Sequence, residues 1–324
     1  MSEAWARGEV LSRDGTRIGY RRYGGRGVGV VLVHGAGQAA QNLHHLAEAL
    51  ADEFVVYVPD RRGRGRSGPT GDHYGLAAER DDLVALVRHS GAVHLFGLSS
   101  GGIVVLRAAR EVPGIRRVAV YEPPLSVDHS TPLGWVPRYE RELAQGNLGA
   151  AAVTAMRGTR TAGPVLRLVP RPVITAALNA ATRSRPERVA GALPPGRAAV
   201  LRVVLWPLRR AAARAGDAGR APAAEVSLRD LVPMMRYDAQ LVAESEGTLD
   251  DYATLTMPVL LLGGSRSAGY LARSLDALQR VLPDVSRVEL SGAGHTAPDN
   301  SEEPRRVADE LRRFFTGPDS RSAA

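Results

Sequence analysis

The sequence of 324 residues contains no cysteine and no lysine. Without cysteine, the chain has no disulfide framework, no thiol nucleophile and no thiolate metal site. All 42 basic residues are arginine, a pattern more typical of a coding bias than of a phosphate-binding surface, although the formal net charge is +8. Aromatic residues make up only 5%, and no helix-turn-helix, zinc-finger or RNA-recognition pattern accompanies the charge. We therefore expect no nucleic-acid binding.

Long apolar runs are also missing. The first ten residues lack the apolar centre of a signal peptide, and no uninterrupted apolar run approaches the length of a transmembrane helix. We therefore expect no stable membrane insertion and a cytoplasmic location. A chain of this length can form one large α/β domain with an insertion, or two ordinary domains.

Short β-prone segments alternate with helical patterns over the first 125 residues and again after residue 254. The apolar, β-branched run from Val28 to Val33 indicates a strand buried on both faces, as in a parallel sheet. Later strands are expected at 54–58, 93–96, 118–121, 258–262 and 285–290, with helices at 76–89, about 103–111, 270–282 and 302–315. This alternation predicts an α/β fold with a doubly wound, mostly parallel sheet.

The alternation stops between Leu125 and Thr254, where the pattern is helical and repeatedly broken by proline. We predict a core of residues 1–124 and 255–317, an inserted helical cap of residues 125–254, and a disordered tail of residues 318–324.

Arginine is concentrated in the predicted cap. The stretch from Arg157 to Arg220 contains thirteen arginines and only two acidic residues, Glu187 and Asp217, which gives a local net charge of +11. Two interpretations stay open. Amphipathic helices can pack on the core with their arginines outside, or the arginines can form a cationic mouth for an acidic substrate or an acidic carrier protein.

The stretch from Gly97 to Gly102 lies between a β-prone segment and a helical pattern. Gly-x-Ser-x-Gly at such a junction is typical of a nucleophile elbow, a turn so tight that only small flanking residues fit. Ser99 is therefore the candidate nucleophile. The amide of Ser100, at the start of the following helix, is positioned to stabilise an oxyanion.

Four features follow one another in a fixed order. They are His34-Gly35 after an early strand, the arginine-glycine turn from Asp60 to Gly68, the serine elbow, and His295 in a glycine-rich loop after the last strand. Together they resemble the α/β-hydrolase superfamily, over about residues 8–125 and 257–315. The resemblance implies the α/β-hydrolase fold, His295 as the general base, His34 as a structural histidine and the Ala36 amide as the second oxyanion donor.

The acid departs from the commoner family pattern. Most members carry it after the strand that follows the cap, where this chain has Gly263-Gly264-Ser265-Arg266-Ser267 and no carboxylate. Glu122 lies at the end of the strand after the elbow helix, which is the position that some members use for the acid. The sequence Tyr121-Glu122-Pro123-Pro124 resembles the acid segment of zearalenone-type lactonases. We therefore predict Glu122 as the acid that orients the imidazole, with Asp128, Asp250 and Asp251 in reserve.

These residues predict a serine hydrolase that cleaves a carboxylic ester or lactone through an acyl-enzyme, with no cofactor. Serine in place of aspartate at the elbow argues against epoxide-hydrolase and haloalkane-dehalogenase chemistry. Three alternatives stay open: a thioesterase or cyclase acting on a carrier-bound acyl chain, a carbon-carbon bond hydrolase, and a non-catalytic small-molecule receptor. The natural substrate and the oligomeric state cannot be predicted from the sequence.

No metal site is expected either. His44 and His45 lie in a helical pattern, with no carboxylate or further histidine that we can assign to complete a set of ligands.

Overall fold

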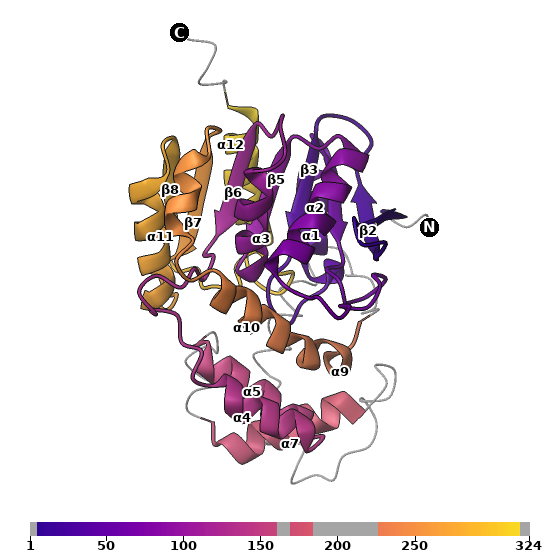
Figure 1. The fold of residues 1–324 in the computed structure, drawn as a ribbon, viewed down its shortest axis with the longest axis vertical. Coiled ribbons are helices and arrows are strands. Elements are labelled where there is room, and N and C mark those ends of the chain that lie inside the picture. The colour runs from indigo at the N-terminus through magenta and orange to yellow at the C-terminus, as the bar shows by residue number, and fades with distance from the viewer. Residues whose placement is uncertain (1–4, 161–168, 184–225, 318–324) are drawn as a thin grey trace.

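The computed structural model of the protein describes residues 5–160, 169–183 and 226–317. Within these residues the chain forms one eight-stranded sheet in the order β1-β2-β4-β3-β5-β6-β7-β8 (Figure 1). The strands are β1 (Ala6–Leu11), β2 (Arg17–Tyr23), β3 (Gly29–Val33), β4 (Val55–Pro59), β5 (His94–Leu98), β6 (Arg117–Tyr121), β7 (Val259–Gly264) and β8 (Val285–Leu290).

The sheet is mostly parallel. β1 and β2 pair antiparallel with each other, β2 pairs antiparallel with β4, and every later pairing is parallel. Every residue of β4, β5 and β6 is buried, which follows from their apolar sequences and from helices on both faces. The predicted doubly wound, mostly parallel sheet is therefore confirmed.

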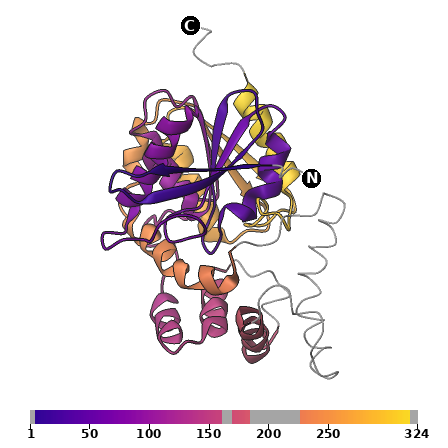
Figure 2. The same ribbon diagram turned by 90° about the vertical axis from the view of Figure 1, so that its right-hand side faces the viewer.

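Helices cover both faces of the sheet (Figure 2). On one face, α1 (His44–Leu50) and α12 (Pro304–Thr316) share a hydrophobic cluster with the strands, and the 3-10 helix η1 (Ala40–Leu43) leads into α1. On the other face lie α2 (Leu76–Ser90), α3 (Ser100–Ala109) and α11 (Gly269–Val281). In α12 the buried residues Val307, Leu311 and Phe315 recur every four residues, so one stripe of the helix faces the sheet.

The chain between β6 and β7 is helical in its described parts. It contains α4 (Val136–Ala144), α5 (Leu148–Gly158), α7 (Arg171–Arg183), α9 (Leu228–Leu231), η4 (Val232–Met234), α10 (Met235–Glu244) and η5 (Leu249–Thr254). α10 lies between one edge of the sheet and the group formed by α4, α5 and α7 (Figures 1 and 2). This edge is the carboxyl end of the parallel strands, because the loop after β5 and α10 line the same cavity.

The division into a core of residues 1–124 and 255–317 and a cap of residues 125–254 stays a prediction. The tail 318–324 and most of the arginine-rich stretch from Arg157 to Arg220 lie outside the described residues. None of the helices in the described ranges combines the length and apolar character needed to cross a bilayer.

Candidate active site

Ser99 joins β5 to α3 in a strained turn. Its φ is 53° and its ψ is −126°, a left-handed φ that non-glycine residues rarely adopt. The flanking glycines are sterically required. A Cβ at Gly97 would lie 2.5 Å from the Cα of Gly102, and one at Gly101 would lie 2.5 Å from the carbonyl oxygen of His34. The sequence therefore folds here into a turn that only glycine permits, and this turn aims the serine at the cavity.

Ser99, His295 and Glu122 form one chain of hydrogen bonds. His295 lies in the loop after β8, and its Nε2 is 3.0 Å from Ser99 Oγ. Its Nδ1 is 2.7 Å from Glu122 Oε2. Because a carboxylate only accepts hydrogen bonds, Nδ1 carries the proton, and Nε2 is free to accept one from the serine hydroxyl. The three predicted side chains are thus brought together in the order that proton transfer from serine requires.

Glu122 follows β6 directly and is held by the neighbouring strand β7. Its Oε1 accepts a hydrogen bond from the amide of Gly264 at 2.7 Å, and its own amide donates to the carbonyl of Leu262 at 3.0 Å. The side chain is buried, and its φ of 46° is again left-handed. A strained backbone held by its surroundings is typical of functional positions. The carboxylate therefore has one oxygen fixed by β7 and the other directed at His295.

The reserve acids lie elsewhere. Asp128 and Asp250 are exposed, and Asp251 pairs with Arg107 and Arg110, each at 2.8 Å. Among the hydrogen bonds of the described residues, His295 Nδ1 has Glu122 as its carboxylate partner. The structure therefore brings Glu122 to the imidazole and leaves the three aspartates away from it.

The two predicted oxyanion donors, Ala36 and Ser100, both line the cavity in front of Ser99. Ser100 is the first residue of α3, so its amide has no acceptor within the helix. The loop that carries Ala36 is held by a side chain of its own, because the amide of Gly35 donates to Gln38 Oε1 at 2.9 Å. Gln38 Nε2 in turn donates to the half-buried carboxylate of Asp299 at 2.8 Å.

His34 supports the same loop as a neutral imidazole. Its Nδ1 donates to the carbonyl of Gly35 at 3.0 Å, and its Nε2 accepts from the amide of Arg61 at 3.2 Å. Complete burial lowers the pKa of His34 well below its ordinary value, and the charges of Arg61 and Arg64 lower it further. The structural role that the family resemblance implies for His34 agrees with these contacts.

The cavity has a volume of about 120 Å³ and mostly apolar walls. Leu98 ends β5 and Tyr270 lies on α11, whereas Pro124, Trp135, Met235 and Val242 come from the chain between β6 and β7. Among the described residues that line it, the ionisable acidic and basic side chains are Asp238 and His295, and no arginine takes part. The cationic mouth considered from the sequence is therefore not formed by the described part of the cavity wall.

A buried cluster of four charges lies behind the elbow, and the sequence did not reveal it as a unit. Arg61 and Arg64 come from the arginine-glycine turn, Glu79 from α2 and Asp238 from α10. Arg61 pairs with Glu79 at 2.5 Å and with Asp238 at 2.7 Å, and Arg64 pairs with Asp238 at 2.8 Å. Arg61 and Arg64 are therefore buried and paired, whereas Arg66 of the same turn is exposed. Burial alone would raise the pKa of Asp238, but Arg64 and Arg61 hold it below its ordinary value.

Asp238 is the functional candidate that the sequence reasoning missed. A signal for it existed, because Asp238 stands one turn before Leu241 and Val242, which are buried on the inward stripe of α10. A carboxylate on such a stripe needs a buried cationic partner. The sequence offers forty-two arginines as partners and does not show which ones meet it.

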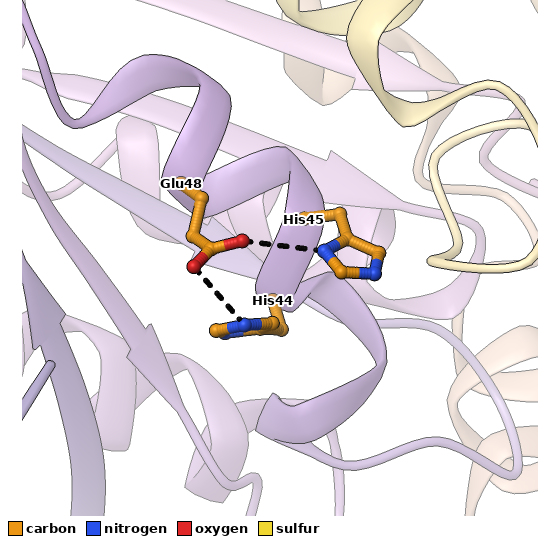
Figure 3. Close-up of side chains that lie close together, drawn as sticks. All are labelled: His44, His45 and Glu48. Carbon is orange, nitrogen blue, oxygen red and sulfur yellow. Dashed lines mark hydrogen bonds and ion pairs between the residues drawn. The ribbon is translucent and has the colours of Figure 1, made fainter. Parts of the chain in front are cut away.

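The expectation that nothing completes a ligand set around His44 and His45 was wrong. Glu48, one turn further along α1, lies 3.2 Å from His44 Nε2 and 3.3 Å from His45 Nδ1 (Figure 3). The donor atoms of the three side chains all lie within 4.8 Å of one another, a spacing that a bound cation could bridge. Hydrogen bonds among the three groups, and one from Tyr23 to His44 Nδ1 at 3.1 Å, account for this spacing without a metal. The cluster does not line the cavity.

Comparison with known proteins shows a family match and similar solved structures over most of the chain. The model of the alpha/beta hydrolase family matches residues 30–310. Across 95% of this chain and 100% of the other, the structure resembles the crystal structure of an alpha/beta hydrolase from Sphaerobacter thermophilus, with a TM-score of 0.67 and 28% identity.

Two curated proteins are similar over shorter segments. N-formylmaleamate deformylase of Pseudomonas putida is 40% identical over 131 residues, which are 39% of this chain and 48% of that protein. The bifunctional esterase/perhydrolase of Acinetobacter calcoaceticus is 34% identical over 112 residues, 32% of this chain and 39% of that protein. The matched segments thus span less than half the length of these curated relatives.

Proposed function

The chain belongs to the alpha/beta hydrolase family, and from this premise we propose that it is a serine hydrolase that cleaves a carboxylic ester or lactone through an acyl-enzyme. The observation that carries the proposal is the chain of hydrogen bonds from Ser99 Oγ through His295 to Glu122, with distances of 3.0 and 2.7 Å. An isolated serine hydroxyl is a weak nucleophile at neutral pH, and this arrangement supplies the base that it needs.

In the first half of the reaction, Ser99 Oγ attacks the carbonyl carbon and its proton passes to His295 Nε2. Glu122 stabilises the imidazolium that forms and keeps the proton on Nδ1, so that Nε2 faces the serine. The single bond between the acyl carbon and the leaving oxygen then breaks, and His295 protonates the departing alkoxide. The product of this half is an ester between Ser99 and the acyl group.

In the second half, His295 takes a proton from water, and the resulting hydroxide attacks the acyl-enzyme. The bond to Ser99 Oγ breaks, and His295 returns its proton to the serine. In both halves the negative charge of the tetrahedral intermediate is stabilised by the amides of Ala36 and Ser100. Two such fixed donors are the largest single contribution in many acyl-transfer enzymes.

The cavity indicates a small and largely apolar acyl group. Its volume is about 120 Å³. Leu98, Trp135 and Val242 supply apolar wall on both the core side and the inserted side. A short acyl chain therefore fits the described walls better than a long one.

A second candidate is hydrolysis of a formamide. It is favoured by the 40% identity, over part of the chain, to a relative named as N-formylmaleamate deformylase. The same three side chains would act, with His295 protonating the leaving nitrogen in place of an alkoxide. The described cavity wall holds no arginine for a carboxylate-bearing substrate, and for this reason the ester or lactone remains the first choice.

A panel of substrates tests these alternatives. Purified protein is assayed with p-nitrophenyl esters, aliphatic lactones, acyl thioesters and N-formyl amides, and the rate of a Ser99→Ala variant is subtracted as background. The proposal expects the highest kcat/KM for the short esters or lactones. Preference for thioesters or for formamides would replace the proposed substrate class, and no turnover of any member would favour the receptor alternative.

A further inference from the structure

One carboxylate joins the two halves of the proposed oxyanion hole. Asp238 Oδ1 accepts a hydrogen bond from Ser100 Oγ at 2.9 Å, and Asp238 Oδ2 accepts one from the amide of Gly37 at 3.3 Å. Ser100 carries one of the proposed oxyanion donors, and Gly37 directly follows Ala36, which carries the other. The carboxylate thus contacts the elbow with one oxygen and the loop after β3 with the other.

The same two oxygens are each fixed by one arginine. Arg61 Nη1 donates to Oδ1 at 2.7 Å and to Ser100 Oγ at 3.0 Å, and Arg64 Nη2 donates to Oδ2 at 2.8 Å. Asp238 therefore accepts four hydrogen bonds, from Ser100, Gly37, Arg61 and Arg64. The residue is 2% exposed, so these hydrogen bonds form with almost no competition from water. Both oxygens are held in place, and so are the two segments that they bind.

Asp238 does not belong to either segment. It comes from α10, in the chain between β6 and β7, and Gly37 is 201 residues away. Met235, one turn earlier on the same helix, packs against Gly37, where a Cβ would lie 3.5 Å from its side chain. The face of α10 that covers the cavity therefore also touches the loop that carries Ala36.

From these contacts we propose that Asp238 is a positioning residue that sets the distance between the amides of Ala36 and Ser100, and so makes the oxyanion hole depend on the docking of α10. The proposal rests on the serine hydrolase function proposed above. Asp238 does not touch the reacting atoms; it acts through Ser100 and Gly37. The chain that follows β6 thereby supplies part of the reaction geometry as well as the wall of the cavity.

An amide at this position cannot replace the carboxylate. All four partners donate toward Asp238, and the NH₂ group of asparagine would face Arg61 or Arg64 in either orientation. In one of the two orientations it would also face the amide of Gly37, which cannot accept a hydrogen bond. Asp238→Asn should therefore release at least one half of the oxyanion hole.

The test measures the oxyanion hole without knowledge of the natural substrate. In a reaction with a fluorophosphonate, Ser99 Oγ forms a bond to phosphorus, fluoride leaves, and the phosphoryl oxygen occupies the place of the oxyanion. The second-order rate constant of labelling should fall about tenfold or more in Asp238→Asn, short of the ~10²–10³ that removal of an oxyanion donor costs. With p-nitrophenyl butyrate, kcat should fall by a similar factor while KM changes less than about twofold.

Two matched controls separate positioning from general destabilisation. Glu79→Gln removes the other buried carboxylate of the same charge cluster but leaves both contacts of Asp238 to Ser100 and Gly37. Glu244→Gln weakens another attachment of α10, the hydrogen bond from the amide of Leu76 to Glu244 Oε2 at 2.6 Å. Both controls should keep a labelling rate within about twofold of the wild type. Equal losses in either control and in Asp238→Asn would overturn the proposal.

A second variant covers the case in which Asp238→Asn does not fold. Ser100→Ala removes the hydrogen bond to Asp238 Oδ1 together with the one that Arg61 donates to Ser100 Oγ, and it retains the backbone donor. Labelling should therefore slow several-fold with no change in circular dichroism. In the variant that combines Asp238→Asn with Ser100→Ala, the loss of labelling rate should be smaller than the two single losses combined. A labelling rate unchanged in both single variants, in protein whose Ser99 is labelled normally, overturns the role of Asp238 alone. A wild-type protein that is not labelled at Ser99 overturns the proposed function and this inference together.

Discussion

His295 Nε2 lies 3.0 Å from Ser99 Oγ, although 196 residues separate them in the chain. Both residues follow strands of the parallel sheet, β8 and β5, at their carboxyl ends. Because the carboxyl ends of parallel strands share one edge of the sheet, residues from distant parts of the sequence meet there. This geometry is the basis of the first two predictions below.

Ser99→Ala should abolish covalent labelling by a fluorophosphonate and lower ester hydrolysis by ~10³ or more, because no other group in the proposed mechanism forms the acyl-enzyme. Mass spectrometry of the labelled wild type locates the modified residue. The far-ultraviolet circular dichroism of the variant should match that of the wild type. A label found on another serine would show that the elbow is not the reactive site.

Glu122→Gln should lower kcat by ~10²–10⁴, because a neutral amide neither stabilises the imidazolium nor fixes the proton on Nδ1. The Oε1 contact to the amide of Gly264 can be kept by glutamine, so the fold should persist. Asp250→Asn and Asp251→Asn are the controls, and steady-state kinetics should show them close to wild type. A large loss in either control with a normal Glu122→Gln would assign the acid to the inserted segment.

Gly97→Ala should destabilise the protein by about 1–3 kcal/mol, because the new Cβ would lie 2.5 Å from the Cα of Gly102 and the backbone has to move. Gly269→Ala is the matched control. A Cβ at Gly269, the first residue of α11, meets no atom within 4 Å, and alanine favours helix over glycine by up to about 1 kcal/mol. Urea unfolding should therefore give a lower free energy of unfolding for Gly97→Ala, and an equal or higher one for Gly269→Ala.

The stability of the protein should fall as the pH decreases below 6.5, in part because of His34. Its folded-state pKa lies well below the ordinary value of 6.5, so below pH 6.5 the unfolded chain binds a proton that the folded chain does not. The contribution is complete above pH 6.5 and decreases by up to about 1.4 kcal/mol per pH unit below it. The free energy of unfolding in urea, measured at pH 7.0 and 5.5, should change less with pH in His34→Gln than in the wild type.

Acyl chain length should limit the rate. A cavity of about 120 Å³ between Leu98, Trp135 and Val242 accommodates a butyryl group more readily than a decanoyl group. We expect kcat/KM for p-nitrophenyl butyrate to exceed that for the decanoate by about tenfold or more. Trp135→Ala, which removes the largest side chain from this wall, should move the preference toward longer chains. A wild-type preference for the decanoate would contradict the assignment of this cavity to the acyl group.

Much of the fold could be predicted because parallel strands and amphipathic helices leave different periodicities. The strand at 285–290 was predicted with the same bounds that the structure has, and the five other strands predicted from the sequence, at 28–33, 54–58, 93–96, 118–121 and 258–262, agree within one or two residues. The relative positions of Ser99, Glu122 and His295 were also predictable, since each directly follows or closely follows a strand of the same sheet. Their catalytic roles remain predictions.

The contacts of Asp238 could not be predicted from the sequence. A buried charge is recognised by its partner, and Arg61 and Arg64 lie more than 170 residues away on another element. The cluster of His44, His45 and Glu48 is a different case. Glu48 stands four residues after His44 on a helix, a spacing that places two side chains on one face, so this contact could have been found by counting along α1.

Because the candidate acid directly follows β6, the nucleophile and the acid lie only 23 residues apart in the sequence. Ser99 and Glu122 belong to one strand-helix-strand unit that is complete before the inserted segment begins, and β7 contributes to Glu122 through the backbone of Leu262 and Gly264 alone. Insertions, deletions or exchanges within residues 125–254 leave the spacing between these two residues unaltered. An exchange of this segment should therefore preserve the proposed pairing of nucleophile and acid, provided that the new segment offers a carboxylate where Asp238 now stands.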